Sequence, residues 1–275
     1  MKFSERFGFT VKSETLQLSE MSQGLRNQIW NCIYKLCGDE FSDRWYKIAE
    51  LIFIKCLKLP LDEIPDQYFA GHFVSTRKIL KKYFMTIPFY DVYDWVETIV
   101  SSSGIFGRQR ETLQDLFNAI YISELSGYRL VDGKHIAITN EVELAAINQA
   151  LQIEDRYSGV KEHIKTSINK LAEKPFPDYR NSIKESISAV ESICKLLSGG
   201  KSISFDQAIR KLDLHPALEQ GFIKLYAWTS DEKGVRHATF DSEMNVGLTE
   251  AIYMLVTCSA FVNFVIEKME ITGSL

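Results

Sequence analysis

Ala251-Ile-Tyr-Met-Leu-Val-Thr-Cys-Ser-Ala-Phe-Val-Asn-Phe-Val-Ile266 is the longest stretch of the chain without a charged residue. Apolar residues fall on nearly every side of a helix drawn through it, which is typical of a helix at the centre of a bundle or at a subunit interface. The stretch contains three polar residues and is shorter than the roughly 20 mostly apolar residues that a membrane span needs. We therefore expect a buried core helix, capped by Thr249 and ending near Lys268, and no membrane span.

The segments ahead of this stretch have the pattern of further helices of the same bundle. Apolar residues recur every three or four positions in 155–172 and again in 178–197, as on one face of an amphipathic helix. Because only a short proline-containing segment separates these two helices, we expect them to form an antiparallel hairpin. A capping-box pattern at Ser204 and a proline at Pro216 begin two more helices. Residues 155–275 are thus predicted to form a C-terminal helical bundle.

The first half of the chain also has helical periodicity. Its clearest apolar stripe predicts a helix near 20–37 that ends at Gly38. Four more amphipathic segments follow, the first of them ended by Pro60 and the last closed by Gly127 as a left-handed cap. We expect an N-terminal helical domain over residues 1–127.

One stretch between the halves has the pattern of β-structure. Tyr128–Val131 and His135–Ile138 flank Asp132-Gly133, a dipeptide preferred in tight type I′ hairpins. Asn140 then has the pattern of an N-cap for the next helix. The predicted fold is mostly α, with two helical domains and a connecting segment, 128–154, that holds a small β-hairpin and a helix.

The composition restricts the class of protein. The 275 residues are 45% hydrophobic and 12% aromatic, as in a packed globular protein. The five cysteines are odd in number and follow no signal peptide, which predicts free, buried thiols in a reducing cytoplasm. The net charge of −4 is divided about evenly between the halves, so neither is a basic nucleic-acid-binding domain, although a local positive patch can still hold a nucleic acid. Common cofactor motifs and metal-ligand spacings do not occur, so we expect neither a cofactor nor a metal site.

The most unusual polar segment, Ser230-Asp-Glu-Lys-Gly-Val-Arg-His-Ala238, lies just ahead of the apolar stretch. It places Arg236 beside His237. Histidine can exchange a proton near neutral pH, and the arginine fork matches phosphate oxygens, so the pair could serve phosphodiester cleavage. The alternative, which the residues alone favour, is that both side chains pair with nearby carboxylates and order the loop.

Two other groups of charged residues are candidates for a supporting role in the site or in binding. Glu191 could reach Arg180 or Arg236, or could lie on a solvated helix face. A basic patch on one helix could touch a phosphate backbone or an acidic partner, or could be only a solvated face; it consists of Arg77, Lys78, Lys81 and Lys82.

Several short motifs resemble known families. Phe3-Ser-Glu-Arg-Phe-Gly8 and Leu25-Arg-Asn-Gln-Ile-Trp-Asn31 resemble the N-terminal domain of bacterial AbiJ-type abortive-infection proteins. Tyr179-Arg-Asn-Ser-Ile-Lys-Glu185 with Glu191, Gly234-Val-Arg-His-Ala238 and the last helix with Asn263 resemble a HEPN domain. The resemblance spans nearly the whole chain.

The HEPN resemblance implies a four- to five-helix bundle that forms a cytoplasmic homodimer and, in many members, is a metal-independent RNase of phage defence. In the family, an arginine is followed four to six residues later by a histidine, and both subunits contribute. Here Arg236 takes the arginine position, its direct neighbour is His237, and no histidine follows in that window. The residues implied to support or bind RNA are Asp231, Lys233, Arg180 and Glu191.

Two further interpretations stay open at this point. A non-catalytic binding or sensor module would recognise a phage component or a partner protein, and the missing downstream histidine favours it. In another arrangement, the N-terminal half binds a ligand and licenses the C-terminal half. The partners that follow from these interpretations are a second copy of the chain, RNA and a phage-derived trigger.

Overall fold

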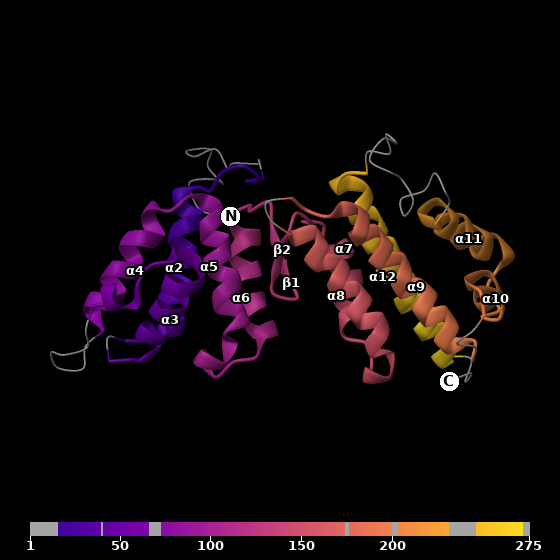
Figure 1. Cartoon of the computed structure of the whole chain (residues 1–275), viewed down its shortest axis with the longest axis horizontal. Helices are drawn as coiled ribbons and strands as arrows, with labels where there is room; N and C mark the ends of the chain where they lie inside the picture. The colour runs from indigo at the N-terminus through magenta and orange to yellow at the C-terminus, as the bar shows by residue number, and fades with distance from the viewer. Residues whose placement is uncertain are drawn as a thin grey trace, which may run out of the picture. The chain divides into compact units, whose positions relative to one another are not determined.

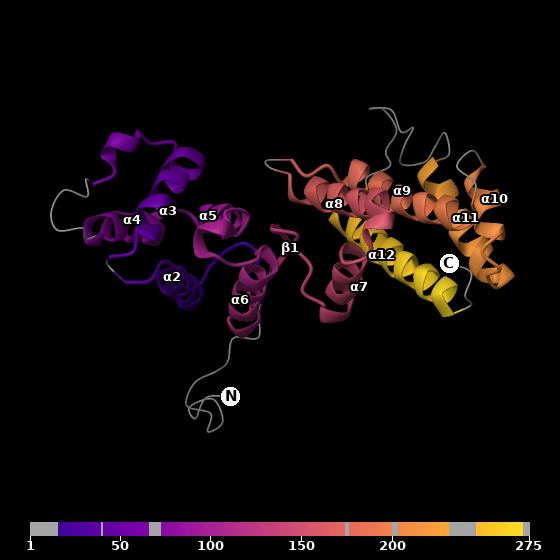
Figure 2. The ribbon, with the colours of Figure 1, turned by 90° about the horizontal axis from the view of Figure 1, so that it is seen from below.

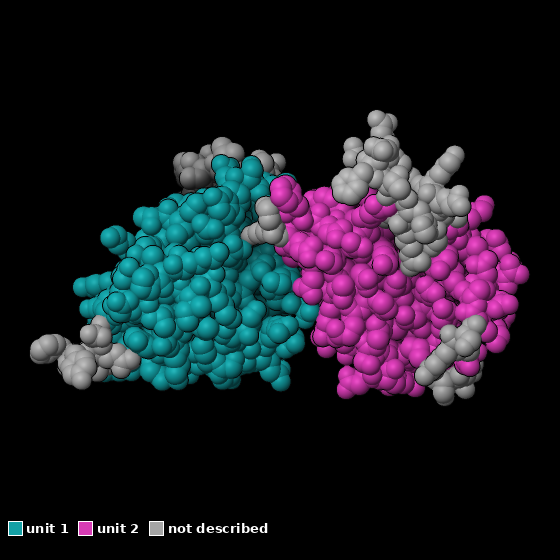
Figure 3. All heavy atoms as spheres, in the orientation of Figure 1, with its two compact units in different colours: residues 1–137 teal, residues 138–275 magenta. Residues whose placement is uncertain are grey.

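The computed structural model describes residues 16–39, 41–65, 73–173, 176–199, 203–230 and 246–271. These residues are mostly α-helical with one two-stranded hairpin, which confirms the predicted fold class (Figure 1). The chain divides into two compact units, Met1–Ala137 and Ile138–Leu275 (Figure 3). The family-like segment at 3–8 lies outside the described residues.

Unit 1 is built on helices whose apolar stripes meet in one core. In its first helix, the four apolar residues from Leu25 to Leu36 that define the stripe are buried, and the Ser22 hydroxyl accepts a hydrogen bond from the Leu25 N–H at 3.1 Å. The rings of Trp30, Phe84 and Trp95 pack in sequence, with centroids 5.3 Å and 5.5 Å apart. The elements of unit 1 before its hairpin are α2 (Gln23–Cys37), α3 (Arg44–Ile52), the π-helix η1 (Phe53–Leu57), η2 (Leu61–Glu63), α4 (Val74–Thr86), α5 (Phe89–Ser101), η3 (Ser103–Phe106) and α6 (Arg110–Ser123).

The second predicted helix differs from a single α-helix. It is α-helical only to Ile52 and continues as the π-helix η1, which Lys58 ends in the left-handed conformation at φ 52°. The Leu59 N–H reaches back to the Phe53 carbonyl at 3.0 Å. The spacing of apolar residues does not reveal such a wide turn, because the turn depends on how the side chains pack against neighbouring helices.

The expected cap at Gly127 was wrong. α6 ends at Ser123, and Leu125 takes the left-handed conformation at φ 54°. Gly127 instead lies under the segment at Gln17 and Leu18, where a Cβ atom would come within 2.5 Å of the Leu18 side chain and 2.9 Å of the Gln17 carbonyl oxygen. Glycine is required there by a close backbone approach.

The predicted hairpin is present as β1 (Arg129–Val131) and β2 (Lys134–Ile136), which pair antiparallel with Leu130 opposite His135. Asp132 and Gly133 both have positive φ, 47° and 78°, as a type I′ turn requires. β1 packs on α6 and β2 on α5, so the hairpin belongs to unit 1.

Unit 2 begins just after the hairpin and contains the helix that was assigned to the connecting segment. Asn140 caps this helix, as expected, through its side-chain oxygen, which accepts from the Val142 N–H at 2.9 Å. The helix belongs to unit 2 because it packs against the last helix of the chain. The elements of unit 2 are α7 (Glu141–Leu151), η4 (Asp155–Tyr157), α8 (Ser158–Ala172), α9 (Tyr179–Leu197), α10 (Phe205–Arg210), α11 (Pro216–Ser230) and α12 (Leu248–Ile271).

α8 and α9 form the expected hairpin, with small residues at their contact. The Ser167 hydroxyl lies 2.9 Å from the Ser182 hydroxyl and 2.8 Å from that of Ser186, and all three residues are fully buried. Because these hydroxyls satisfy one another, two helices can meet closely without an unpaired polar group. The capping box at Ser204 is also present, as is Pro216 in the first turn of its helix.

α12 contains the uncharged stretch Ala251–Ile266, and this helix is longer than expected. It covers 24 residues from Leu248, and the Glu250 side chain accepts from the Gly247 N–H at 2.9 Å, whereas Thr249 was expected as the cap. Within the described residues it is the one helix whose length and hydropathy, 1.6, would suffice for a membrane span. It packs beside α9 in both views (Figures 1 and 2), and half of that apolar window is buried. This is compatible with the core helix of a soluble protein.

Candidate functional site

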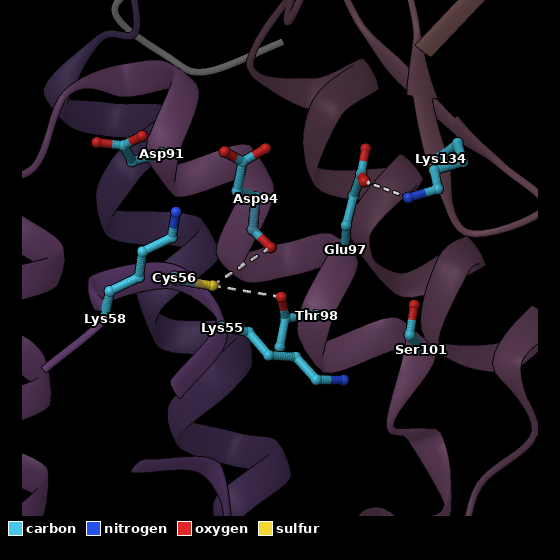
Figure 4. Close-up of a pocket in the computed structure, with 9 residues that line it drawn as sticks. All are labelled: Lys55, Cys56, Lys58, Asp91, Asp94, Glu97, Thr98, Ser101 and Lys134. Carbon is cyan, nitrogen blue, oxygen red and sulfur yellow. Dashed lines mark hydrogen bonds and ion pairs between the residues drawn. The ribbon is translucent and has the colours of Figure 1, made fainter. Parts of the chain in front are cut away.

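The described part of unit 1 contains a polar pocket of about 530 Å³ (Figure 4). A pocket of this size is in the range that holds small ligands. α5, the π-helix η1 with the residue after it, and β2 supply its walls. The lining residues are Lys55, Cys56, Lys58, Asp91, Asp94, Glu97, Thr98, Ser101 and Lys134.

α5 reaches the pocket with one face and the core with the other. Asp91, Asp94, Thr98 and Ser101 follow at spacings of three, four and three, so they share one side of the helix. The opposite side carries apolar residues such as Val96 and Val100, which are buried. The apolar stripe of this helix was found in the sequence, and its polar stripe is the signal that would have pointed to the pocket.

The floor of the pocket holds the thiol of Cys56. Its sulfur lies 3.3 Å from the Thr98 hydroxyl and 3.9 Å from the Asp94 carbonyl oxygen. Burial raises the pKa of this thiol, and the hydrogen bond with Thr98 offsets that only in part. Cys56 is therefore a protonated hydrogen-bonding group in the wall, as expected for a thiol that is not a nucleophile.

Glu97 joins the pocket to the hairpin behind it. Its carboxylate accepts from the Lys134 ammonium at 3.1 Å, the His135 backbone N–H at 2.9 Å and the His135 ring Nδ1 at 3.1 Å. Burial alone would raise the pKa of Glu97, but the bonds and charge of His135, together with Lys134, outweigh it and hold the pKa at about 2. Glu97 is thus a carboxylate over the whole physiological range.

His135 is part of a buried polar chain. Its Nε2 lies 2.9 Å from the hydroxyl of Tyr121, and its ring packs edge-on to Tyr93 with centroids 4.7 Å apart. Burial raises the pKa of Tyr121 well above its usual value, so the phenol stays protonated. On the other side of the ring, Nδ1 lies 3.1 Å from the Glu97 carboxylate, so the imidazole links Tyr121 to Glu97. This histidine holds the hairpin on α5 and α6.

Most of the residues predicted to form the catalytic site lie outside the described part of the chain. Residues 231–245 are not described, and they include Arg236, His237, Asp231 and Lys233. The described helices α11 and α12 precede and follow this segment. The expectation that the charged side chains of this segment act together therefore rests on the sequence alone.

Glu191 and Arg180, the two predicted supporting residues that are described, lie far apart on α9. Glu191 lies eleven positions after Arg180, which corresponds to about 16 Å along a helix, so the two do not pair. The Glu191 carboxylate instead contacts the Lys195 ammonium at 2.7 Å and accepts from the Tyr226 hydroxyl at 3.4 Å. Because Tyr226 is near the end of α11, Glu191 is held close to the start of the 231–245 segment.

The basic patch on α4 is present as a helix face. Lys78, Lys81 and Lys82 are exposed, and Arg77 is half-buried with its guanidinium 5.5 Å from the centre of the Tyr34 ring. Among the described residues, none of these four lines the polar pocket of unit 1. Within the same described ranges, no three histidine, cysteine, aspartate or glutamate residues are grouped as a metal site requires.

The match to known families covers the first unit and continues beyond it. The family described as AbiJ N-terminal domain 4 matches residues 1–153, which include unit 1, its hairpin and α7 of unit 2. No curated protein and no solved structure matches the chain. Since the matched residues make up more than half of its 275 residues, the chain belongs to the AbiJ N-terminal domain 4 family and is an AbiJ-type protein, which points to abortive-infection phage defence.

Proposed function

We propose that this protein acts in the cytoplasm in abortive infection and that unit 2 is a HEPN-like, metal-independent endoribonuclease that a phage-derived trigger activates. The observation that carries the proposal is the family match over residues 1–153 together with Arg236 and His237 in the segment between α11 and α12. Unit 2 supports it as a helical bundle in which α7, α8 and α9 pack against an apolar final helix.

In the proposed reaction, His237 accepts the proton of an RNA 2′-hydroxyl as its oxygen attacks the adjacent phosphorus. The bond from phosphorus to the 5′-oxygen then breaks, and that oxygen takes up a proton. Arg236 neutralises the charge that builds up on the phosphate oxygens in the transition state. Neither step requires a metal ion. His237 accepts the proton, and Arg236 stabilises the negative charge, so the two side chains supply the effects for which a metal ion would otherwise be needed.

Glu191 supports this assignment through its place beside α11. Its contact with Tyr226 fixes the helix turn from which the segment with Asp231 and Lys233 departs. The Tyr226 ring also stacks on Phe205 of α10, with centroids 4.5 Å apart. These contacts hold the last turns of α11, which directly precede Asp231 in the sequence.

A second copy of the chain completes the proposed site. α12 exposes large apolar side chains on one face, with Tyr253 56%, Phe264 42% and Ile271 79% exposed. Spacings of eleven and seven residues place all three on the same side of a helix. We therefore propose a homodimer through this face, since large exposed apolar side chains that share one helix face mark interaction surfaces.

The ribonuclease is tested by induced expression and by the purified protein with RNA in the presence of a metal chelator. We expect wild type to fragment RNA and arrest growth, and Arg236→Ala and His237→Ala each to lose about a hundredfold or more in cleavage rate. Arg108→Ala, at an exposed arginine of unit 1, is the matched control and keeps full activity. RNA cleavage that survives Arg236→Ala would refute the assignment.

The dimer is tested by the molar mass of the protein in solution. Phe264→Glu is expected to convert a dimer to a monomer because it places a charge in the apolar face, whereas Val142→Glu, at an 80% exposed residue of α7, leaves the mass unchanged. A wild type that is monomeric at all concentrations, or a Phe264→Glu variant that stays dimeric, contradicts this part of the proposal.

The competing function is a binding or sensor module without catalysis. It is favoured by one observation, namely that His237 directly follows Arg236 and no histidine occurs at the downstream spacing that HEPN RNases use. In that case wild type and His237→Ala give equal RNA integrity and equal growth. Growth arrest with intact RNA in both would select the sensor.

A further inference from the structure

We propose that the polar pocket of unit 1 is a binding site for a small phosphorylated sugar or polyol. The phosphate would lie against Lys55 and Ser101, and the hydroxyls would donate to Asp91 and Asp94 (Figure 4). The site is independent of Arg236 and His237, so its failure would leave the ribonuclease proposal standing.

The lining carries both kinds of charge, with three lysines and three carboxylates. Among the residues drawn in Figure 4, the one ion pair joins Lys134 to Glu97. The ammonium groups of Lys55 and Lys58 are exposed, and neither forms an ion pair with a residue that the structure describes. Two lysines are therefore available to an anion that enters the pocket.

The two lysines serve different ends of the pocket. In Figure 4 the Lys55 chain extends toward Ser101, and the Lys58 ammonium points toward Asp91 and Asp94. The π-helix positions both, since Lys55 lies within it and Lys58 follows it in the left-handed conformation. Left-handed backbone at a lysine is uncommon and unfavourable, and such residues gather at binding sites.

The chemistry of the lining decides the class of ligand. It contains no aromatic side chain, so a nucleobase would find no ring on which to stack. Carboxylates accept hydrogen bonds and have several acceptor positions, so Asp91 and Asp94 can take hydroxyl donors in addition to the contacts that they already make. A compound with a phosphate and several hydroxyls uses the lysines and the carboxylates at once.

The charge balance excludes the simpler anions as the preferred ligand. The three lysines are matched by three carboxylates, so a bare phosphate would meet the lysines but would also be repelled by Asp91 and Asp94 and would offer them no hydroxyl donor. An uncharged sugar would leave Lys55 without a partner. Tight binding therefore needs a phosphate and several hydroxyls in one molecule.

The test is calorimetric titration of the full chain with ribose 5-phosphate, glucose 6-phosphate and glycerol 3-phosphate. Inorganic phosphate and free ribose are the controls, because they represent the phosphate group and the hydroxyl-bearing part of the ligand separately. We expect at least one phosphorylated probe to bind with a Kd below about 1 mM and at least tenfold more tightly than either part alone. Failure of all three phosphorylated probes overturns the proposal.

Variants locate the binding in the pocket. Lys55→Gln and Asp94→Asn should each weaken binding tenfold or more, because each removes one charge-assisted contact. Lys35→Gln, at an exposed lysine of α2 away from the pocket, changes the net charge equally and should leave the Kd unchanged. Equal loss in Lys55→Gln and Lys35→Gln would show attraction by overall charge and would refute the site.

Discussion

The carboxylate of Glu97 offers a sharp test of how unit 1 is held together. Glu97→Gln keeps the size of the side chain and removes the charge that Lys134 and His135 both approach. The native pKa of about 2 lies about 2.5 below the ordinary value of 4.5, and each pKa unit corresponds to about 1.4 kcal/mol. The ionised group therefore stabilises the fold by about 3 kcal/mol at pH 7. Glu97 is 18% exposed, so solvent screening reduces this figure only in part.

The same linkage fixes how the effect depends on pH. Because the pKa of Glu97 is lower in the folded than in the unfolded chain, its stabilisation is complete above about pH 4.5 and is lost as the pH falls toward 2. At pH 3 roughly 1 kcal/mol of it is left. The difference between wild type and Glu97→Gln should shrink by about half or more between pH 7 and pH 3.

The measurement is denaturant unfolding followed by tryptophan fluorescence. Trp30, Trp45 and Trp95 are buried in unit 1, and a Trp228→Phe background removes the remaining tryptophan, which lies in unit 2. Glu63→Gln, at an exposed glutamate of the same unit, is the control and should change the stability little. A loss below about 0.5 kcal/mol at pH 7, or one that does not vary with pH, would refute the assigned role of Glu97.

Three further predictions concern the backbone of unit 1, each measured in the same unfolding assay. Gly127→Ala should cost about 1–3 kcal/mol, because the new Cβ would press on the Gln17 carbonyl oxygen, which cannot move aside like a side chain; an unchanged midpoint would contradict the close approach. Gly133→Ala should cost about 1–2 kcal/mol because its φ is 78°, and a neutral result would argue against the type I′ turn. Asn118→Ala should cost about 1–3 kcal/mol and speed hydrogen exchange at the Leu130 amide, since the Asn118 side chain bonds both the N–H and the carbonyl of Leu130, at 2.8 Å and 2.9 Å; unaltered exchange would rule that role out.

Much of the fold follows from patterns within a few residues. The helix that ends at Gly38, the cap at Asn140, the capping box at Ser204 and the turn at Asp132-Gly133 all occur where the sequence indicates them. Each depends on bonds between neighbours in the chain, so the local sequence contains the information. The π-turn after Ile52 and the close approach at Gly127 depend on residues that arrive from elsewhere in the chain, and they were not foreseen.

The candidate sites divide in the same way. Arg236 and His237 were found because they are neighbours, and they lie in a segment that the structure does not describe. The pocket of unit 1 was missed, because its lysines and carboxylates come from η1, α5 and β2. A motif search compares short spacings, and Lys134 lies 37 residues from the carboxylate that it pairs with.

By itself, the sequence determined that the chain is mostly helical, that its last helix is apolar, and where several helices and the hairpin begin, because periodicity and capping act over a few residues. The tertiary structure alone decided that the hairpin belongs to unit 1, that α7 belongs to unit 2 beside α12, and that Glu97, His135 and Tyr121 form one buried chain. Packing made these decisions, since burial and hydrogen bonding select among distant segments by shape and charge, which no local pattern records.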